Sequence, residues 1–305
     1  MNRRVLLALL ICAALVALSC GKKSAPRIVM PKKPGTPINI TAIRRPGGIA
    51  LAWERRSSAE SYEVSRLARD GSVVTSSTEK PGFMDTATDD SKDYIFTVVS
   101  ISDEGIFSDY SAPLDIGPLP ALAAPAPFTS AITGDGVRLT WGDADTVNIY
   151  RELVNTPYDT DPYAERIQNS PYDDRPDPKA AVKYSARAAG YALLNAVRFE
   201  GPASNDAIVT PTDYLPSGTK GIKAFRKEDE VVVMWDENPE RWVTGYEVLR
   251  EGEGGEFGVI ATVWPPAFTD SNPPRGETAY KVRAVGPGIA GPASDAVRVG
   301  PAEPK

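Results

Sequence analysis

The segment with the strongest chemical signature is a glycine-rich run near the C-terminus. Residues 286–291 read Gly-Pro-Gly-Ile-Ala-Gly, which satisfies the G-x-G-x-x-G pattern of dinucleotide-binding proteins. That chemistry requires a strand before the glycines and a helix after them, so that the pyrophosphate meets a helix N-terminus. Here the run contains Pro287 and lies between two predicted strands. We therefore interpret it as a hairpin loop and expect no cofactor.

Nucleophilic chemistry lacks its usual residues. The chain contains no histidine, so Ser-His-Asp and Cys-His arrangements cannot form, and zinc and copper sites lose their commonest ligand. The pairs Ser77/Lys80 and Ser217/Lys220 match the S-x-x-K signature of penicillin-binding proteins, but the companion Ser-Asp-Asn and Lys-Thr-Gly elements are absent. The sequence predicts no catalytic residues.

Acidic side chains offer two further kinds of site. Asp159, Asp161, Asp173 and Asp174 could gather a calcium ion, but their spacing is not that of an EF-hand. We interpret them as solvated loop acids and expect no metal. A glycosidase would need two carboxylates about 5–10 Å apart in a cleft, and we keep that activity only as a third hypothesis.

The charge balance argues against nucleic acid as a partner. The chain has 34 basic and 40 acidic residues, a net charge of −6. Nothing offers the basic stripe that counterion release from a phosphate backbone requires.

One pattern of predicted strands is repeated three times along the chain and provides the scaffold for these side chains. Each copy has an alternating apolar strand ending in tryptophan, a second strand, an aromatic-x-Asp pair, and a tyrosine that opens another alternating strand. The copies are Ile49, Leu51, Trp53, Tyr62, Val64, Phe83, Asp85, Tyr94, Phe96 and Val98; then Val137, Leu139, Trp141, Val147, Ile149, Tyr172, Asp174 and Tyr184; then Val231, Val233, Trp235, Tyr246, Val248, Phe268, Asp270, Tyr280, Val282 and Ala284. Such self-similarity, with period 2 inside each strand, predicts an all-β protein of three tandem sandwiches.

These residues resemble fibronectin type III domains, which have an immunoglobulin-like fold. The resemblance rests on the repeated tryptophans and tyrosines, on the Tyr-Glu-Val of residues 62–64 and 246–248, and on the Gly-Pro-Ala-Ser of residues 201–204 and 291–294. It implies two antiparallel sheets of seven strands in each domain and no catalytic residues. We expect the tryptophans to fill the space between sheets, the tyrosines to form corner hydrogen bonds, and the aspartates to satisfy local N–H groups.

The N-terminus has the layout of an export signal. Arg3 and Arg4 precede an apolar run, residues 5–18, that is too short to span a membrane comfortably. The run ends in Ser19-Cys20, which resembles a bacterial lipobox and implies lipidation, including palmitate, of Cys20 after cleavage. Because the only other cysteine, Cys12, would leave with the signal, no disulfide competes for Cys20. The alternative is an ordinary secretory signal with a stray cysteine.

The sequence predicts the following organisation. The segments are a signal peptide (1–19), a lipidated, basic, proline-containing tether (20–37), domain 1 (38–116), a linker (117–127), domain 2 (128–210), a linker (211–218), domain 3 (219–300) and a tail (301–305). We expect an extended tether, short proline-containing joints of limited flexibility, and contact between the apolar hairpin 191–199 of domain 2 and domain 1.

Two tryptophans fall outside the repeated core pattern. Trp242 and Trp264 belong to loops that this topology places at one pole of domain 3, together with the loop 286–291, and Arg241 adjoins Trp242. They could stiffen the joint with domain 2, or they could stack on a sugar or capture a peptide. We favour the joint.

The whole resembles the fibronectin-type lipoproteins of Gram-negative bacteria. The resemblance implies a membrane-anchored, non-catalytic spacer or protein-binding scaffold of the cell envelope, whose protein partner the sequence does not name. Gly21 follows the cysteine where an aspartate would imply retention at the inner membrane, so we favour the outer membrane. The alternative is a carbohydrate-binding accessory protein acting on peptidoglycan or exopolysaccharide.

Overall fold

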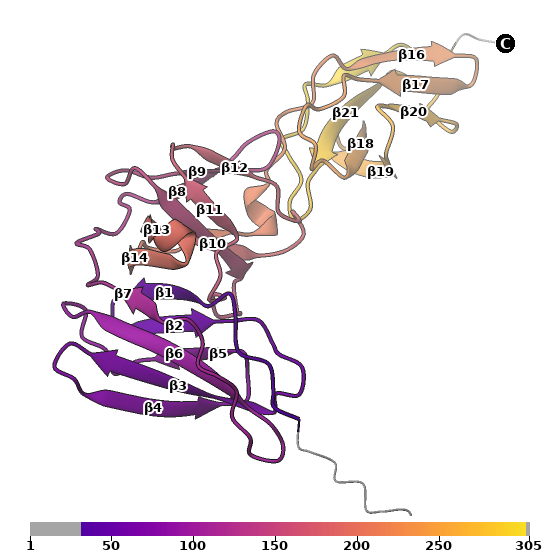
Figure 1. Ribbon diagram of the computed structural model, residues 1–305. Coiled ribbons are helices and arrows are strands. Elements are labelled where there is room, and N and C mark those ends of the chain that lie inside the picture. The colour runs from indigo at the N-terminus through magenta and orange to yellow at the C-terminus, as the bar shows by residue number, and fades with distance from the viewer. Residues whose placement is uncertain (1–31, 303–305) are drawn as a thin grey trace, which may run out of the picture.

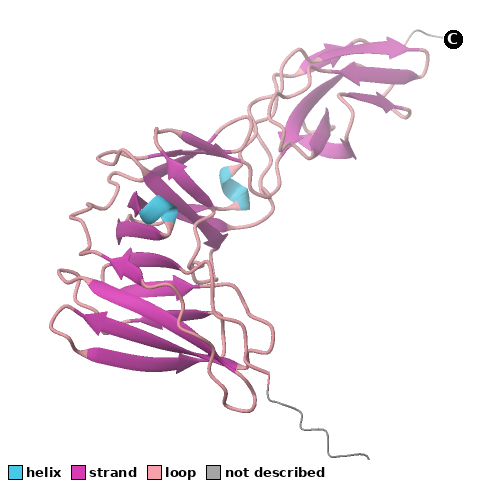
Figure 2. Ribbon diagram, viewed as in Figure 1, coloured by secondary structure: helices cyan, strands magenta, loops and turns pink. Residues whose placement is uncertain are grey.

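The computed structural model describes residues 32–302, which form an elongated array of three β-sandwiches (Figures 1 and 2). Cys20 and the expected signal peptide lie outside the described residues. The described part contains strands β1 to β22 and two short 3-10 helices, η1 (Leu193–Asn195) and η2 (Pro211–Asp213). No helix within it has the length and apolar character needed to cross a bilayer.

The first sandwich packs a three-stranded sheet on a four-stranded sheet. The strands are β1 (Thr41–Arg45), β2 (Gly48–Ala52) and β5 (Gly82–Asp85) in one, and β4 (Val73–Thr78), β3 (Ser61–Ala68), β6 (Tyr94–Ile101) and β7 (Leu114–Ile116) in the other. The sequence alternation decides which side chains enter the core. In β6, for example, Tyr94, Phe96 and Val98 are buried while Ile95 is exposed.

The second sandwich has the same order and adds one strand. Its sheets are β8 (Thr129–Ile132), β9 (Val137–Thr140) and β12 (Tyr172–Asp174), and β11 (Ala164–Ile167), β10 (Val147–Leu153), β13 (Val182–Ala192) and β15 (Ala207–Val209). The additional strand is β14 (Val197–Ala203), which returns from the long β13 as an antiparallel hairpin. This hairpin prolongs the sheet beyond the sandwich.

The third sandwich again pairs three strands with four. The strands are β16 (Lys223–Lys227), β17 (Glu230–Met234) and β20 (Ala267–Asp270), and β19 (Phe257–Val263), β18 (Gly245–Glu251), β21 (Thr278–Val285) and β22 (Val297–Val299). The strand order of the three units is that of tandem fibronectin type III-like sandwiches, as expected from the repeated pattern.

Each sandwich encloses one tryptophan of the repeated pattern. Trp53, Trp141 and Trp235 are 6–8% exposed. Trp53 meets Tyr62 edge to face with ring centroids 5.3 Å apart, and Trp235 meets Tyr246 in the same way. These indoles seal the space between the two sheets.

The repeated aspartates each bind an arginine near the end of the strand that follows the tryptophan. Asp174 accepts hydrogen bonds from Arg151 and from the Tyr184 hydroxyl, each at 2.8 Å. Asp270 receives the equivalent pair from Arg250 and Tyr280. Domain 1 departs from this scheme.

In domain 1 the aspartate and the tyrosine separate. Asp85 pairs with Arg66 at 2.7 Å, whereas the Tyr94 hydroxyl accepts a hydrogen bond from the backbone N–H of Asp89. Of the three tyrosines expected to form corners, Tyr94 makes the expected backbone contact, whereas Tyr184 and Tyr280 bind the aspartate.

Candidate functional site

Domains 1 and 2 share one β-sheet. Strand β14 of domain 2 pairs in parallel with β1 of domain 1, with Ala42 opposite Val197 and Arg44 opposite Phe199. The backbone N–H of Ala42 donates to the carbonyl of Ala196 at 2.8 Å. The result is a continuous sheet in the order β11-β10-β13-β14-β1-β2-β5, with β15 also on β13. The hairpin therefore continues the sheet of domain 1 instead of only resting on it.

Apolar contacts follow the same route. The core of domain 1 incorporates Val197 and Phe199 from β14 and has Leu119 and Leu122 of the linker packed against it. The linker crosses β14 at Gly201, where an added Cβ would lie 2.7 Å from the Leu122 carbonyl oxygen. Glycine is required there because a side chain would collide with backbone.

A buried carboxylate lies at the centre of this joint. Glu200 of β14 is 0% exposed and accepts hydrogen bonds from Asn148 Nδ2 at 2.7 Å, from the Tyr150 hydroxyl at 2.7 Å and from Arg45 Nε at 2.6 Å. Arg198 Nε lies 3.1 Å from the same carboxylate. Arg45 comes from domain 1, so the charge of one domain is neutralised partly by the other. Burial, and then the Glu200 charge, raises the pKa of Tyr150, which keeps its hydroxyl a donor.

Arg44 fixes the linker on the other side of β1. Its side chain is fully buried and donates to the carbonyls of Gly117 at 2.6 Å and Asp89 at 2.8 Å. Burial lowers the pKa of this guanidinium. The two carbonyls accept from its Nη1 and Nη2, whereas its buried Nε has no hydrogen-bond partner. The start of the linker is thereby tied to domain 1.

A groove of about 1000 Å³ opens beside this joint. The outer face of the β1-β2-β5 sheet forms one wall, and the domain 2 residues Asp161, Glu165 and Arg198 line the other. Arg198 binds Glu165 at 2.6 Å and Asp161 at 3.4 Å. These three charges are therefore already paired within the protein.

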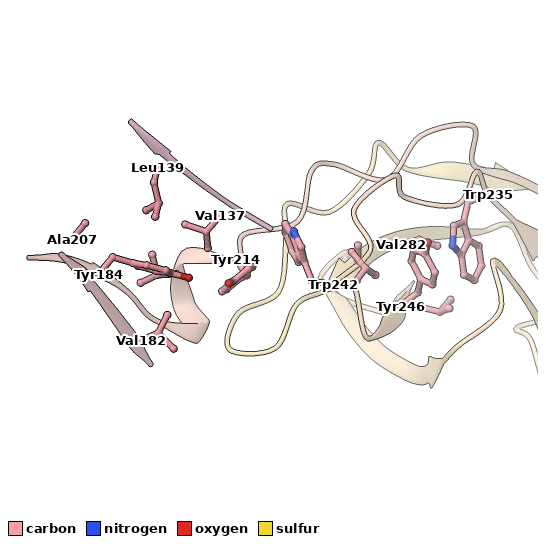
Figure 3. Close-up of a cluster of buried hydrophobic side chains, with 14 of the residues drawn as sticks. Val137, Leu139, Val182, Tyr184, Ala207, Tyr214, Trp235, Trp242, Tyr246 and Val282 are labelled. Carbon is pink, nitrogen blue, oxygen red and sulfur yellow. The ribbon is translucent and has the colours of Figure 1, made fainter. Parts of the chain in front are cut away.

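The joint between domains 2 and 3 is built around Trp242 (Figure 3). Its indole is 7% exposed, its Nε1 donates to the Thr133 carbonyl of domain 2 at 3.0 Å, and its ring meets Tyr214 of the linker edge to face at 5.5 Å. One hydrophobic cluster therefore runs from the core of domain 2 through Tyr214 and Trp242 into domain 3.

Arg241 also bridges this joint. Its backbone N–H donates to the Gly134 carbonyl at 3.0 Å, and its Nε lies 3.7 Å from Asp135. The side chain is 67% exposed, so its ion pair contributes little, and the backbone bond is the stronger of the two contacts.

The glycine run 286–291 packs on the linker. A Cβ added at Gly286, Gly288 or Gly291 would come within 3.0 Å of Tyr214, Pro211 or Pro216, respectively. The run lies between β21 and β22, with no helix after it. Its glycines allow the linker to approach the loop backbone closely, which accounts for the pattern without a cofactor.

Trp264 lies apart from this joint. It follows the last residue of β19 and is 69% exposed. It lines a groove of about 410 Å³ whose other lining residues all belong to domain 3. Trp264 therefore lies beside the loop that carries Trp242, but its exposed ring does not enter the joint, and the expected joint-stiffening role is corrected for Trp264.

The remaining candidate residues have structural partners. Asp173 pairs with Arg138 at 2.7 Å, and Asp174 belongs to the core of domain 2, so the four loop acids do not gather. Between residues 32 and 302, no group of three or more acidic or thiol side chains could hold a metal ion. Ser217 binds Glu240 and Asn238 through its backbone and hydroxyl, away from Lys220.

Comparison with known proteins finds likenesses among solved structures. The FN1–FN3 domains of chicken CNTN1 align with 89% of this chain and 100% of theirs, at 14% identity and a TM-score of 0.29. A Fn3-like protein from Clostridium thermocellum aligns with 28% of this chain and 92% of its own, at 22% identity and a TM-score of 0.25. No protein-family model and no curated protein matches the sequence. The sheet order of the three sandwiches carries the fold assignment.

Proposed function

We propose that this chain is a non-catalytic lipoprotein of the bacterial cell envelope that acts as a membrane-anchored spacer or protein-binding scaffold. The observation that carries the proposal is the construction of its two joints. A spacer must hold its ends at a fixed separation, and joints between tandem domains are flexible unless the interface is large and apolar.

Both joints meet this requirement by different means. The first extends a β-sheet across the domain boundary and buries Glu200 against Arg45 of the other domain. The second inserts Trp242 between linker and domain 2. Both devices limit rotation of one sandwich against the next.

The anchoring half of the proposal rests on Cys20 and its lipobox-like context in the sequence. Two or more acyl chains give stable membrane anchoring, whereas one chain gives reversible binding. We favour the outer membrane, and the partner we propose is another envelope protein that docks on the array.

Expression of the full chain and of Cys20→Ser in a Gram-negative host supplied with labelled palmitate tests the anchor. The full chain should incorporate label and float with membranes, and the variant should do neither. Equal labelling of both, or no label in either, would remove the lipoprotein half of the proposal while leaving the jointed array intact.

A further inference from the structure

Trp264 is the one tryptophan that the fold leaves in water. All five tryptophans lie in the described part of the chain. Four are at most 8% exposed, and Trp264 is 69% exposed. Neither the core nor the joint accounts for its position. A large apolar ring held at the surface is typical of a binding site.

The indole forms one side of a groove in domain 3. The groove is lined by Trp264, by Gly245 and Tyr246 of β18, and by the loop 237–241. A Cβ on Gly245 would lie 2.9 Å from the Val263 carbonyl oxygen, so glycine is favoured at this lining position. The turn that carries Trp264 is fixed by a hydrogen bond from the Trp235 N–H to the Pro266 carbonyl at 3.1 Å.

The opposite wall is ordered before any ligand arrives. The Asn238 N–H donates to the Tyr246 hydroxyl at 2.8 Å, and Asn238 Nδ2 donates to the Ser217 carbonyl at 2.9 Å. The Ser217 N–H donates to Glu240 at 2.9 Å. A wall held in this way reduces the ordering cost of binding.

The hydrogen bonds within this wall keep Glu240 ionised. Burial alone would raise the pKa of Glu240, but the hydrogen bonds from Ser217 and Asn238 outweigh it and lower that pKa. Glu240 is therefore a carboxylate across the neutral range.

Two charged groups at the rim keep free hydrogen-bonding capacity. Glu237 is exposed, and the Arg241 side chain is 67% exposed, with its Nε 3.7 Å from Asp135. Together they offer acceptors and donors beside an apolar ring. We propose that this groove binds a saccharide, with a pyranose stacked on Trp264 and its hydroxyls bonded to Glu237 and Arg241.

The chemistry of the lining selects this class over a proline-rich peptide. The C–H face of a pyranose carries partial positive charge and suits the negative face of an indole. Sugar hydroxyls can both donate to Glu237 and accept from Arg241. A proline-rich segment presents no side-chain donor and would leave the Glu237 carboxylate without a hydrogen bond from the ligand. Saccharide binding at this site would add to the spacer role, and it uses Arg241, which also bridges the joint.

Fluorescence titration tests the proposal directly, because Trp264 is the exposed fluorophore. The chain without residues 1–19 is titrated with N-acetylchitotetraose and cellotetraose up to about 10 mM, which covers the weak millimolar range. At least one should shift or quench the emission saturably. Trp264→Ala should bind that sugar at least tenfold more weakly by calorimetry, and Glu237→Gln should weaken it severalfold. Tyr110→Ala, which removes an aromatic ring 66% exposed in domain 1, should leave binding unchanged.

Three outcomes would overturn the proposal. They are no saturable signal with either sugar, equal affinity in Trp264→Ala, and preferential binding of a polyproline peptide at the same groove. Circular dichroism of Trp264→Ala establishes that the variant is folded. None of these outcomes bears on the lipid anchor or on the joints, which are tested by separate measurements.

Discussion

Replacing Glu200 with glutamine should uncouple the first two domains. The substitution keeps the size of the side chain but removes the negative charge that Arg45 and Arg198 share at 2.6 and 3.1 Å. Because Glu200 is 0% exposed, water cannot reach this site to solvate the two arginine charges that lose their carboxylate. Breaking a buried ion pair from one side costs about 3–5 kcal/mol. For a domain of this size, that corresponds to a fall in melting temperature of more than about 10 °C.

Calorimetry of the array supplies the assay. In the unmodified chain, domains 1 and 2 should unfold in one transition, because they share a sheet. In Glu200→Gln that transition should move down and split. Glu247→Gln in domain 3 is the matched control. Its partner Arg283 also lies at 2.6 Å, but both side chains are partly exposed, so the loss should stay below about 1 kcal/mol.

A double-mutant cycle with Arg45→Met locates the effect at the domain boundary. A hydrogen bond to a charged group contributes about 1.5–3 kcal/mol, so the double variant should be less destabilised than the sum of the single variants. Equal melting shifts in Glu200→Gln and Glu247→Gln, or strict additivity with Arg45→Met, would refute the reasoning.

Three further changes probe the second joint and the core of domain 2. Trp242→Ala should broaden the interdomain distances seen in solution scattering and destabilise its surroundings by about 3–5 kcal/mol, whereas the profile of Trp264→Ala should match that of the unmodified chain. Gly288→Ala should lower the free energy of unfolding by about 1–3 kcal/mol, because the added methyl group overpacks against the linker. Gly276→Ala, which has open space around it, should leave stability nearly unchanged. Equal melting temperatures of the two variants would contradict this. Burial, and then the bond to an aspartate, raises the pKa of Tyr184 above its ordinary 10.0, so its stabilising effect is full below about pH 10 and is lost as pH rises further. Denaturant titrations from pH 8 to pH 12 should therefore show a shallower alkaline decline in Tyr184→Phe, and parallel curves would exclude this residue as a contributor.

The sandwich architecture was open to prediction from sequence because it depends on local periodicity. The alternation of apolar and polar residues in strands such as β6 predicts which face of the strand enters the core. The repeated tryptophans lie on that face, and Trp53, Trp141 and Trp235 are buried as this pattern predicts. Because this period-2 alternation is a property of a single strand, it can be recognised in the sequence without knowing the tertiary contacts.

The shared sheet was beyond sequence reasoning because strand pairing across domains leaves no periodic signal. The hairpin that carries β14 was recognisable as apolar and as directed toward domain 1. That it adds a parallel strand to β1 depends on the relative placement of two domains. The one available signal was the presence of Arg198 and Glu200 inside an otherwise apolar hairpin, since buried charges need partners.

The two loop tryptophans show a similar limit. Sequence placed Trp242 and Trp264 at the same pole of domain 3, and both do lie at loops there. Whether a ring enters the joint depends on which loop reaches domain 2. The loop of Trp242 bonds to Thr133 and Gly134, whereas the turn of Trp264 follows an edge strand.

Spin-label distances test the central claim, that the array is rigidly jointed, most directly. Because the sequence beyond Cys20 has no cysteine, a Cys20→Ser chain without residues 1–19 can be labelled specifically at cysteines introduced at the exposed positions Ser77, Lys179 and Lys227, one in each domain. The pairs 77/179 and 179/227 should each give a single narrow distance distribution that broadens in Glu200→Gln and Trp242→Ala, respectively. Broad distributions in the unmodified chain would contradict the account.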